Sequence, residues 1–294
     1  MSAAIWCADL GMSSVVLERE KELYGQLRWI HRAIKNYLGV AANNGTKLIE
    51  LFERSAAAWG IDAETNVSIE AIDCKTGMVR LADGRALTGR VLFIATGVRR
   101  RALEIPGELE FQGKGILRSG AGERESVKGE RVVVVGGGDA AAENALLLSE
   151  RADKVLLIHR KNALTARTEF QEKVAATPNI ELILDTEIAE IGGTDHVEWV
   201  ETTPSRGGSR KRLLTDHFIA RIGVTPNSEL FTSQLATDER GYIITDNLCR
   251  TSVEYVYAIG DVANPISPTI ATAIGTGTAA AKAASSLLTS LKPV

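Results

Sequence analysis

The segment RVVVVGGGDAA, residues 131–141, decides the fold of this chain. Four consecutive valines predict a short buried strand of a parallel sheet, and three glycines end it at once. The residues from Asp139 to Ser149 are strong helix formers, and the apolar run Val155–Ile158 predicts the next strand. A β-α-β unit of this length has a right-handed crossover, so we expect both strands in one parallel sheet.

The glycines of this segment have the spacing of a dinucleotide-binding turn, G-x-G-x-x-A. Gly136, Gly138 and Ala141 follow a predicted strand and open a predicted helix, which is the context that gives the motif its meaning. Small residues let backbone N–H groups approach a pyrophosphate at the helix N-terminus, where Asp139 and Ala140 lie. The alternative interpretation is a glycine-rich turn that binds no ligand.

The residues after the second strand indicate which nucleotide binds. An NAD-selective site places an acidic residue there to accept the ribose hydroxyls. This chain instead has His159, Arg160 and Lys161, with Arg167 shortly beyond. Several cations suit the 2′-phosphate of NADP(H), so we expect NADP(H) rather than NAD(H). The alternative is a solvated basic patch.

Length and composition limit the class of protein. At 294 residues the chain is long enough for two ordinary domains. Hydrophobic residues make up 45% and charged residues 24%, which predicts a folded globular protein. The formal charge of 34 − 37 = −3 provides no basic field for nucleic acid. The uncharged stretch Val262–Ala281 contains two prolines and two glycines, so it does not predict a membrane span.

Cysteine and histidine usage points to a reducing compartment without a metal site. Cys7, Cys74 and Cys249 are far apart and form no C-x-x-C pair, which favours the cytoplasm. The four histidines lack the spacing of metal ligands. The N-terminus shows no secretion signal.

Other apolar runs also end in glycine turns. Val91–Ile94 precedes Gly97, and Tyr255–Ile259 precedes Gly260. Both predict buried strands whose carboxyl ends meet a ligand. The alanine-rich stretch Thr269–Leu288 predicts a long helix.

The N-terminal region repeats this organisation incompletely. Ala3–Leu10 predicts a helix, and Ser14–Leu17 predicts a strand that Glu18 closes. A nucleotide-binding β-α-β unit needs a strand and a glycine loop before that helix. We therefore expect the first strand and phosphate loop of this domain to be missing from the sequence, with Met1 as an internal methionine of a longer product.

The order and spacing of these motifs resemble the low-molecular-weight thioredoxin reductases, a group of flavin-dependent pyridine nucleotide-disulfide oxidoreductases. The resemblance covers essentially the whole chain. It rests on Gly136–Ala141, His159 with Arg160, Arg221–Asn227, Tyr257–Val262, Glu18, Gly25–Leu27, Asn36 with Tyr37, and Ala95–Gly97. It implies an α/β fold with two Rossmann-like, three-layer dinucleotide-binding domains, and a homodimer. The NAD(P)H-binding domain, residues 106–225, would be inserted into an FAD-binding domain formed by residues 1–105 and 226–294.

The resemblance also implies two sets of cofactor-binding residues. For FAD, Glu18 would hold the adenosine ribose, Asp261 the ribityl chain or pyrophosphate, and the helix beginning near Thr269 would face the flavin. The full set implied for FAD is Glu18, Gly25, Gln26, Leu27, Asn36, Ala95, Thr96, Gly97, Gly260, Asp261, Thr269, Ile270 and Ala271. The set implied for NADP(H) is Gly136, Gly138, Asp139, Ala140, Ala141, His159, Arg160, Lys161 and Arg167.

Two departures from the family pattern bear on function. Where thioredoxin reductases carry a redox-active C-x-x-C followed by an acidic residue, this chain has SGAG, residues 119–122, and then Glu123. Neither serine nor glycine forms the thiolate that disulfide exchange requires. Glu123 is a candidate proton donor near the flavin, with a surface loop acid as the alternative. In addition, Pro268-Thr269-Ile270 replaces the family's Arg-Gln-Ala.

These observations predict an NADPH-dependent flavoprotein oxidoreductase. Hydride would pass from NADPH to FAD and on to an acceptor other than an internal disulfide, with a ferredoxin- or flavodoxin-type carrier favoured. One alternative is a non-catalytic nucleotide-binding or regulatory homologue. Another is a disulfide reductase that works with the thiols of a partner, such as a thioredoxin-like protein.

Overall fold

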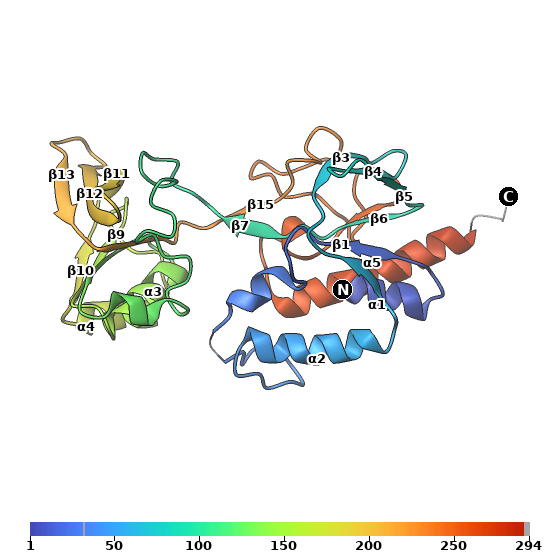
Figure 1. Cartoon of the computed structure of the whole chain (residues 1–294), viewed down its shortest axis with the longest axis horizontal. Helices are drawn as coiled ribbons and strands as arrows, with labels where there is room; N and C mark the ends of the chain where they lie inside the picture. Colours follow the sequence, from blue (N-terminus) through green and yellow to red (C-terminus); the bar gives the residue numbers. More distant parts are fainter. Residues whose placement is uncertain (32, 291–294) are drawn as a thin grey trace. The chain divides into compact units, whose positions relative to one another are not determined.

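The computed structural model describes residues 1–31 and 33–290, so residue 32 and residues 291–294 of the expected FAD-binding domain lie outside the described part. The chain divides into two compact units, shown in Figure 1. Unit 1 comprises Met1–Arg99 and Thr225–Val294, and unit 2 comprises Arg100–Val224. The strands β7 (Val98–Arg100) and β15 (Val224–Pro226) contain the two points of division.

The first division lies upstream of the Ile105–Gly107 turn, where the sequence places the boundary. The structure packs this turn inside unit 2, because the carbonyl oxygen of Pro106 accepts a hydrogen bond from Ile191 N at 3.0 Å. A Cβ on Gly107, whose φ is +84°, would lie 1.9 Å from the oxygen of Ile191. The proline-glycine pair is therefore a turn packed inside unit 2.

Unit 2 is built on a four-stranded parallel sheet of order β10-β9-β8-β14. Its strands are β8 (Arg131–Val135), β9 (Lys154–Ile158), β10 (Ile180–Ile183) and β14 (His217–Ala220). Helix α3 (Asp139–Ser149) connects β8 to β9, and α4 (Thr168–Ala176) lies between β9 and β10 in the sequence. The predicted parallel β-α-β unit is confirmed, with Val132 opposite Val155.

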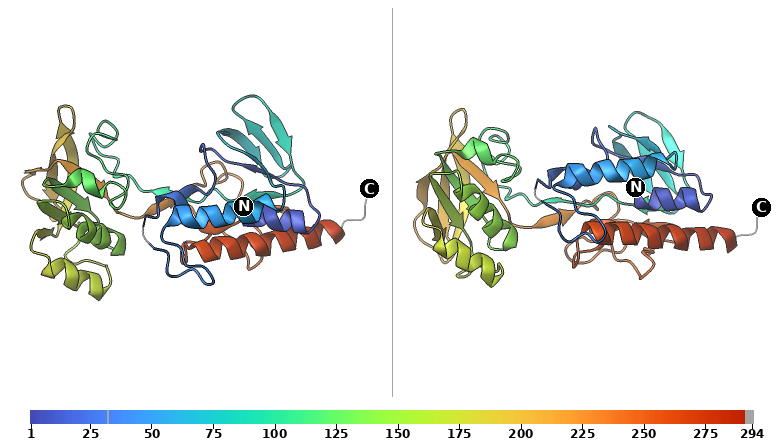
Figure 2. Two further views of the ribbon diagram at one scale, coloured as in Figure 1. Left: turned by 60° about the horizontal axis from the view of Figure 1, so that its bottom comes forward. Right: turned by 90° about the horizontal axis from the view of Figure 1, so that it is seen from below.

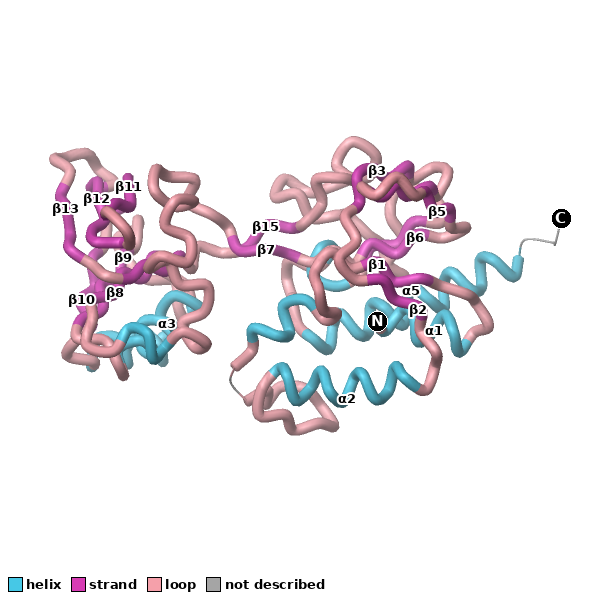
Figure 3. Tube along the Cα trace, viewed as in Figure 1, coloured by secondary structure: helices cyan, strands magenta, loops and turns pink. Residues whose placement is uncertain are grey.

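The valines of β8 are buried on both faces of this sheet, which explains the unbroken apolar run. Val132 and Val134 pack with Ala141, Ala145 and other helix residues on one face. The alternate valines of β8 pack on the other face against an antiparallel sheet. That sheet contains β11 (Thr186–Gly193), β12 (Val197–Pro204) and β13 (Lys211–Leu214). Figure 3 shows the strands of both sheets in magenta and the helices in cyan. Unit 2 therefore has three layers.

Among the described residues, unit 1 contains three small sheets besides the β7–β15 pair at the division. In the parallel pairs, β1 (Val15–Leu17) joins β2 (Asp62–Glu64), and β16 (Val256–Ala258) joins β6 (Leu92–Ile94). The third sheet is antiparallel and contains β3 (Ile69–Asp73), β4 (Met78–Leu81) and β5 (Ala86–Thr88). The strands predicted at Ser14–Leu17, Val91–Ile94 and Tyr255–Ile259 are confirmed to within one or two residues.

Helices cover these strands. They are α1 (Ser2–Asp9), α2 (Gly45–Ala57) and α5 (Ile270–Ser290), with the short 3-10 helices η1 (Gly25–Trp29) and η3 (Gly260–Ala263). A Cβ on Gly277 of α5 would lie 3.0 Å from Ala3 N, so the glycine permits the close packing of α1 on α5. Figure 2 shows the two helices side by side. No described helix has the length and apolar character that crossing a bilayer demands.

Candidate functional site

The carboxyl edge of the parallel sheet in unit 2 gathers the residues that the sequence predicts for NADP(H). The Gly136–Gly138 loop follows β8 and His159–Lys161 follows β9, and parallel pairing of the two strands places both segments at one edge. Arg221 follows β14, which pairs in parallel with β8 on its other side. The order along this edge is therefore the basic segment, the glycine loop and Arg221.

The N-terminus of α3 fits a pyrophosphate. No side chain caps this end, and the described residues offer no acceptor for the backbone N–H groups of Gly137–Ala140. A Cβ on Gly138 would have one neighbour, Thr165 Oγ1 at 3.9 Å, which leaves room beside the loop. Free N–H groups at a helix N-terminus are suited to an anion.

His159 lies beneath the glycine loop and not beside it. A Cβ on Gly137 would lie 2.3 Å from Cε1 of the imidazole, and His159 is only 8% exposed. Its Nε2 has no hydrogen-bond partner among the described residues. Burial, and then the charges of Lys161 and Arg160, lower the pKa of His159. The structure therefore makes His159 a neutral support of the loop rather than one of the predicted cations.

Arg160 and Lys161 are exposed at the end of β9, and the β12–β13 hairpin tip fixes the backbone around them. Ser205 Oγ donates to the carbonyl oxygen of Arg160 at 2.8 Å, and Ser205 N donates to that of Asp185 at 2.7 Å. Asp185 N donates to the oxygen of Lys161 at 3.0 Å, and the Asp185 carboxylate pairs with Arg206 at 3.6 Å. Two predicted cations thus remain available to a phosphate.

Arg167 and Asp139, both predicted to bind the nucleotide, contact each other. Arg167 Nε lies 2.6 Å from Asp139 Oδ2, and Arg167 N donates to Oδ1 at 2.8 Å. The backbone hydrogen bond from Arg167, together with its side chain, lowers the pKa of Asp139. This pair joins the N-terminus of α4 to that of α3, so much of the charge of Arg167 is already matched.

The SGAG segment forms a closed loop around the carboxylate of Glu123. Glu123 Oε2 accepts hydrogen bonds from Arg118 N at 2.8 Å and from Ser119 N at 2.7 Å. Ser119 Oγ accepts one from Gly122 N at 3.1 Å. Because the carboxylate serves the backbone of its own loop, the geometry favours the structural role of Glu123 over proton donation.

The chain's three cysteines do not replace the absent pair. Cys7, Cys74 and Cys249 are all free, and each is at most 5% exposed. Burial raises the pKa of each thiol, so the reactive thiolate is disfavoured.

In unit 1, the residues predicted for FAD divide into those that serve the fold and those that remain available. Gln26 Nε2 donates to the carbonyl oxygen of Val98 at 2.9 Å and is thus engaged within the unit. Glu18 follows β1, and its Oε1 accepts from Glu20 N at 3.0 Å. The remaining acceptor capacity of this carboxylate suits a ribose hydroxyl. Asn36 is exposed, without a regular element around it.

Asp261 is the strongest FAD candidate in unit 1. It lies in η3 directly after β16, and no donor to its carboxylate is found in the described ranges. Burial raises the pKa of Asp261, as expected for a half-buried carboxylate without a partner. Thr269 Oγ1 accepts from Thr272 N at 3.1 Å and so caps the beginning of α5. A partly buried, unpaired acceptor fits the hydroxyl groups of a ribityl chain.

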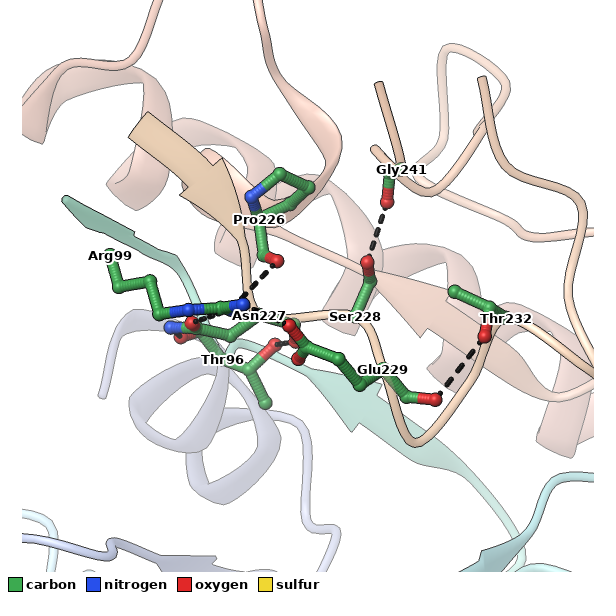
Figure 4. Close-up of polar contacts among 8 residues, drawn as sticks. All are labelled: Thr96, Arg99, Pro226, Asn227, Ser228, Glu229, Thr232 and Gly241. Carbon is green, nitrogen blue, oxygen red and sulfur yellow. Dashed lines mark hydrogen bonds and ion pairs between the residues drawn. The ribbon is translucent and has the colours of Figure 1, made fainter. Parts of the chain in front are cut away.

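Thr96 takes part in a network that the sequence did not predict (Figure 4). Its Oγ1 donates to the carbonyl oxygen of Asn227 at 2.6 Å, and Asn227 Nδ2 donates to the oxygen of Thr96 at 2.8 Å. Arg99 Nη1 donates to Asn227 Oδ1 at 2.9 Å, and Arg99 also pairs with Glu229 at 2.5 Å. The sequence shows the Thr-Pro-Asn motif that contains Asn227, but it does not show that Asn227 contacts Thr96.

Comparisons with known proteins extend over nearly the whole chain. Residues 1–284 match the pyridine nucleotide-disulphide oxidoreductase family. The chain is 35% identical over 266 residues to the thioredoxin reductase of Dictyostelium discoideum, covering 88% of this chain and 83% of that protein. It is 29% identical to a 34.2 kDa protein in the rubredoxin operon of Clostridium pasteurianum, with 96% and 91% covered. The crystal structure of Lactococcus lactis thioredoxin reductase matches with a TM-score of 0.87 at 28% identity, covering 99% and 95%.

These similarities confirm the predicted family and the predicted pair of Rossmann-like domains. Thioredoxin reductases use FAD and NADPH, which confirms the expected cofactors at the level of the family. The chain belongs to the pyridine nucleotide-disulphide oxidoreductases, as a thioredoxin reductase-like, FAD-dependent enzyme that takes its electrons from NAD(P)H.

Proposed function

We propose that this chain is an NADPH-dependent flavoprotein oxidoreductase that delivers electrons to a separate acceptor and not to a disulfide of its own. The feature that supports the proposal is the SGAG loop, in which Ser119 and Gly122, by the resemblance to thioredoxin reductases, stand where the family has its redox-active cysteines. The three cysteines that the chain does have are free and buried. Disulfide exchange needs an accessible thiolate, and none of these residues supplies one.

Unit 2 is the NADP(H)-binding domain in this proposal. The free N–H groups of Gly137–Ala140 hold the pyrophosphate, and the exposed side chains of Arg160 and Lys161 hold the 2′-phosphate. Hydrogen bonds from the hairpin residue Ser205 and from Asp185 keep the backbone of these cations in place.

Unit 1 is the FAD-binding domain. The carboxylates of Glu18 and Asp261 accept hydrogen bonds from hydroxyl groups of the cofactor. Gly25–Leu27 and the Ala95–Gly97 turn provide backbone near it. FAD held by these residues would supply the redox chemistry, since a flavin can take a hydride from NADPH and pass the electrons on singly or in pairs.

The acceptor that we favour is a small one-electron carrier of the ferredoxin or flavodoxin type. An enzyme that lacks a dithiol has no two-electron relay of its own, so a carrier that takes electrons from the flavin is the simplest partner. The relative from Clostridium pasteurianum is named for a rubredoxin operon, which supports a carrier of this kind. We further propose a cytoplasmic homodimer.

The test is an anaerobic acceptor screen with the protein as its natural gene product. Ferredoxin, flavodoxin, thioredoxin and a quinone are compared under NADPH, with the Ser119→Cys/Gly122→Cys double variant as matched control. We expect the parent to reduce one-electron carriers and to leave thioredoxin oxidised, while the double variant acquires two titratable thiols.

Three other outcomes would contradict the proposal. Thioredoxin reduction by the parent alone would refute the argument from the SGAG loop. Thioredoxin reduction only in the presence of an added thiol protein would indicate a reductase that works with partner thiols. A colourless protein that binds NADP⁺ but reduces no acceptor would indicate a regulatory homologue.

A further inference from the structure

Arg221 is a buried cation without an anionic partner. It follows β14 at the carboxyl edge of the parallel sheet, and only 6% of it is exposed. Within residues 1–31 and 33–290, no carboxylate lies within ion-pair distance of its guanidinium, and its buried Nε has no hydrogen-bond partner. Burying a charge without a counter-charge is strongly unfavourable. This cost calls for an explanation.

The contacts of the guanidinium are with neutral groups and with another cation. Nη1 donates to the carbonyl oxygen of Ala220 at 2.8 Å, and Nη2 donates to that of Arg118 at 3.1 Å. Burial, and then the charge of Arg100, lower the pKa of Arg221 to about 10, while Glu123 opposes this shift. The Glu123 carboxylate is already engaged by two backbone N–H groups of its own loop. The positive charge of Arg221 therefore remains largely uncompensated.

The backbone of Arg221 abuts the glycine loop of the nucleotide site. Arg221 N donates to the carbonyl oxygen of Val135, and a Cβ on Gly136 would lie 2.3 Å from the oxygen of Arg221. Gly136 also has a φ of +142°, which L-residues with side chains rarely adopt. Both the clash with Arg221 and this backbone conformation therefore exclude a side chain at position 136. The backbone of Arg221 is thus in direct contact with the backbone at the start of the glycine loop.

The order of groups along the edge assigns Arg221 to one half of the nucleotide. The cations Arg160 and Lys161 follow β9 and mark the adenosine end with its 2′-phosphate. The free N–H groups of the loop after β8 mark the pyrophosphate. Because β14 lies on the other side of β8 from β9, a dinucleotide bound in this order would extend its nicotinamide half towards Arg221.

We propose that Arg221 supplies the positive charge that holds the nicotinamide-side phosphate of NADP(H). This inference rests on the proposed function of unit 2 as the NADP(H)-binding domain. In a medium of low dielectric constant, a buried cation attracts a nearby phosphate strongly and is screened little by salt. The bound phosphate in turn provides the counter-charge that the protein lacks.

The experiment compares two ligands and two variants by isothermal titration calorimetry. NADP⁺ contains the nicotinamide-side phosphate, whereas 2′,5′-ADP contains only the phosphates of the adenosine half. In Arg221→Met we expect the Kd of NADP⁺ to rise about tenfold to a hundredfold, while the Kd of 2′,5′-ADP stays the same. Arg160→Ala, the matched control, is expected to weaken both ligands.

Salt and thermal unfolding distinguish this role from a structural one. The loss of NADP⁺ affinity in Arg221→Met is expected to persist at high salt. The loss of NADP⁺ affinity in Arg160→Ala is expected to become smaller at high salt, because Arg160 is exposed and salt screens its charge. Without nucleotide, Arg221→Met is expected to unfold at the parent's temperature or higher, since a buried charge has been removed. Arg221→Lys, which keeps the charge, is expected to retain most of the affinity.

Several results would overturn the inference. Equal Kd values for NADP⁺ in parent and Arg221→Met would refute it, and so would an equal loss for both ligands together with a lower unfolding temperature. These outcomes leave the proposed function intact as long as the parent binds both ligands. If the parent binds neither NADP⁺ nor 2′,5′-ADP, the proposed function itself fails.

Discussion

The imidazole of His159 packs against the backbone of Gly137, so closely that a Cβ on the glycine would lie 2.3 Å from Cε1 and 2.4 Å from Nε2. The contact joins the end of β9 to the loop after β8. Any side chain at position 137 must therefore displace either the ring or the loop that we propose binds the pyrophosphate.

Gly137→Ala is expected to destabilise the protein by about 1–3 kcal/mol, the usual cost of overpacking a filled interior. It is also expected to weaken NADP⁺ binding, because the loop shifts. Urea unfolding and calorimetry measure the two effects. Gly275→Ala in α5 is the matched control, since its Cβ would meet no atom within 4 Å. Equal unfolding midpoints for the two variants would contradict the expected role of the contact.

The lowered pKa of His159 predicts a pH dependence of stability. A histidine whose folded-state pKa is depressed favours folding while it is neutral. The contribution of His159 to the free energy of unfolding is therefore complete when the pH is above the ordinary histidine pKa of about 6.5. It decreases as the pH falls through the folded-state pKa. Urea midpoints between pH 7.5 and 5.5 are expected to fall more steeply for the parent than for His159→Gln. Parallel curves for the two proteins would show that the ring does not titrate in this way.

The double variant Arg160→Ala/Lys161→Ala is expected to raise the KM for NADPH about tenfold to a hundredfold, the equivalent of one or two charge-assisted hydrogen bonds. The KM for NADH and kcat are expected to change little, because these cations would contact only the 2′-phosphate. Steady-state reduction of ferricyanide gives KM and kcat with NADPH and with NADH. Lys154→Ala serves as control. Lys154 is the first residue of β9, at the opposite end of this strand from Arg160 and Lys161, and it forms an ion pair with Glu181. An equal rise in KM for both nucleotides would argue against a 2′-phosphate site.

Asn227→Ala is expected to destabilise the protein by about 0.5–1.5 kcal/mol, because it removes the hydrogen bonds of the Asn227 amide with the carbonyl oxygen of Thr96 and with Arg99 Nη1. Thr232→Ala removes one long, exposed hydrogen bond of 3.3 Å nearby and is expected to change stability by less than about 0.5 kcal/mol. Urea unfolding of both variants tests the difference. A cost for Asn227→Ala no larger than that for Thr232→Ala would show that the network in Figure 4 adds little.

The part of the fold that local sequence determines was predictable. In Arg131–Ser149, a valine run buried on both faces, a glycine turn and a helix-forming stretch agree with one another, and α3 begins and ends where the sequence indicates. The packing of the Ile105–Gly107 turn on β11 was less predictable, because a proline-glycine turn has the same sequence whether it is exposed or packed.

Residue types in the candidate site were predictable, but their partners were not. The sequence shows that His159 and Arg167 are basic. Burial lowers the pKa of His159, however, and Arg167 forms an ion pair with Asp139. Such outcomes depend on contacts between residues distant in the chain. In the sequence, Arg221 stands out only as the first residue of the Arg221–Asn227 motif. A charged residue directly after an apolar strand was the available signal for its role.

The hydrogen bond from Ser205 to the carbonyl oxygen of Arg160 links residues 45 positions apart. A mutation in the β12–β13 hairpin is therefore expected to alter coenzyme preference without changing any residue that contacts the nucleotide. Directed evolution of this enzyme towards NADH needs to sample the hairpin as well as the end of β9. Natural homologues with different hairpin lengths are expected to differ in coenzyme preference even where the basic pair is retained.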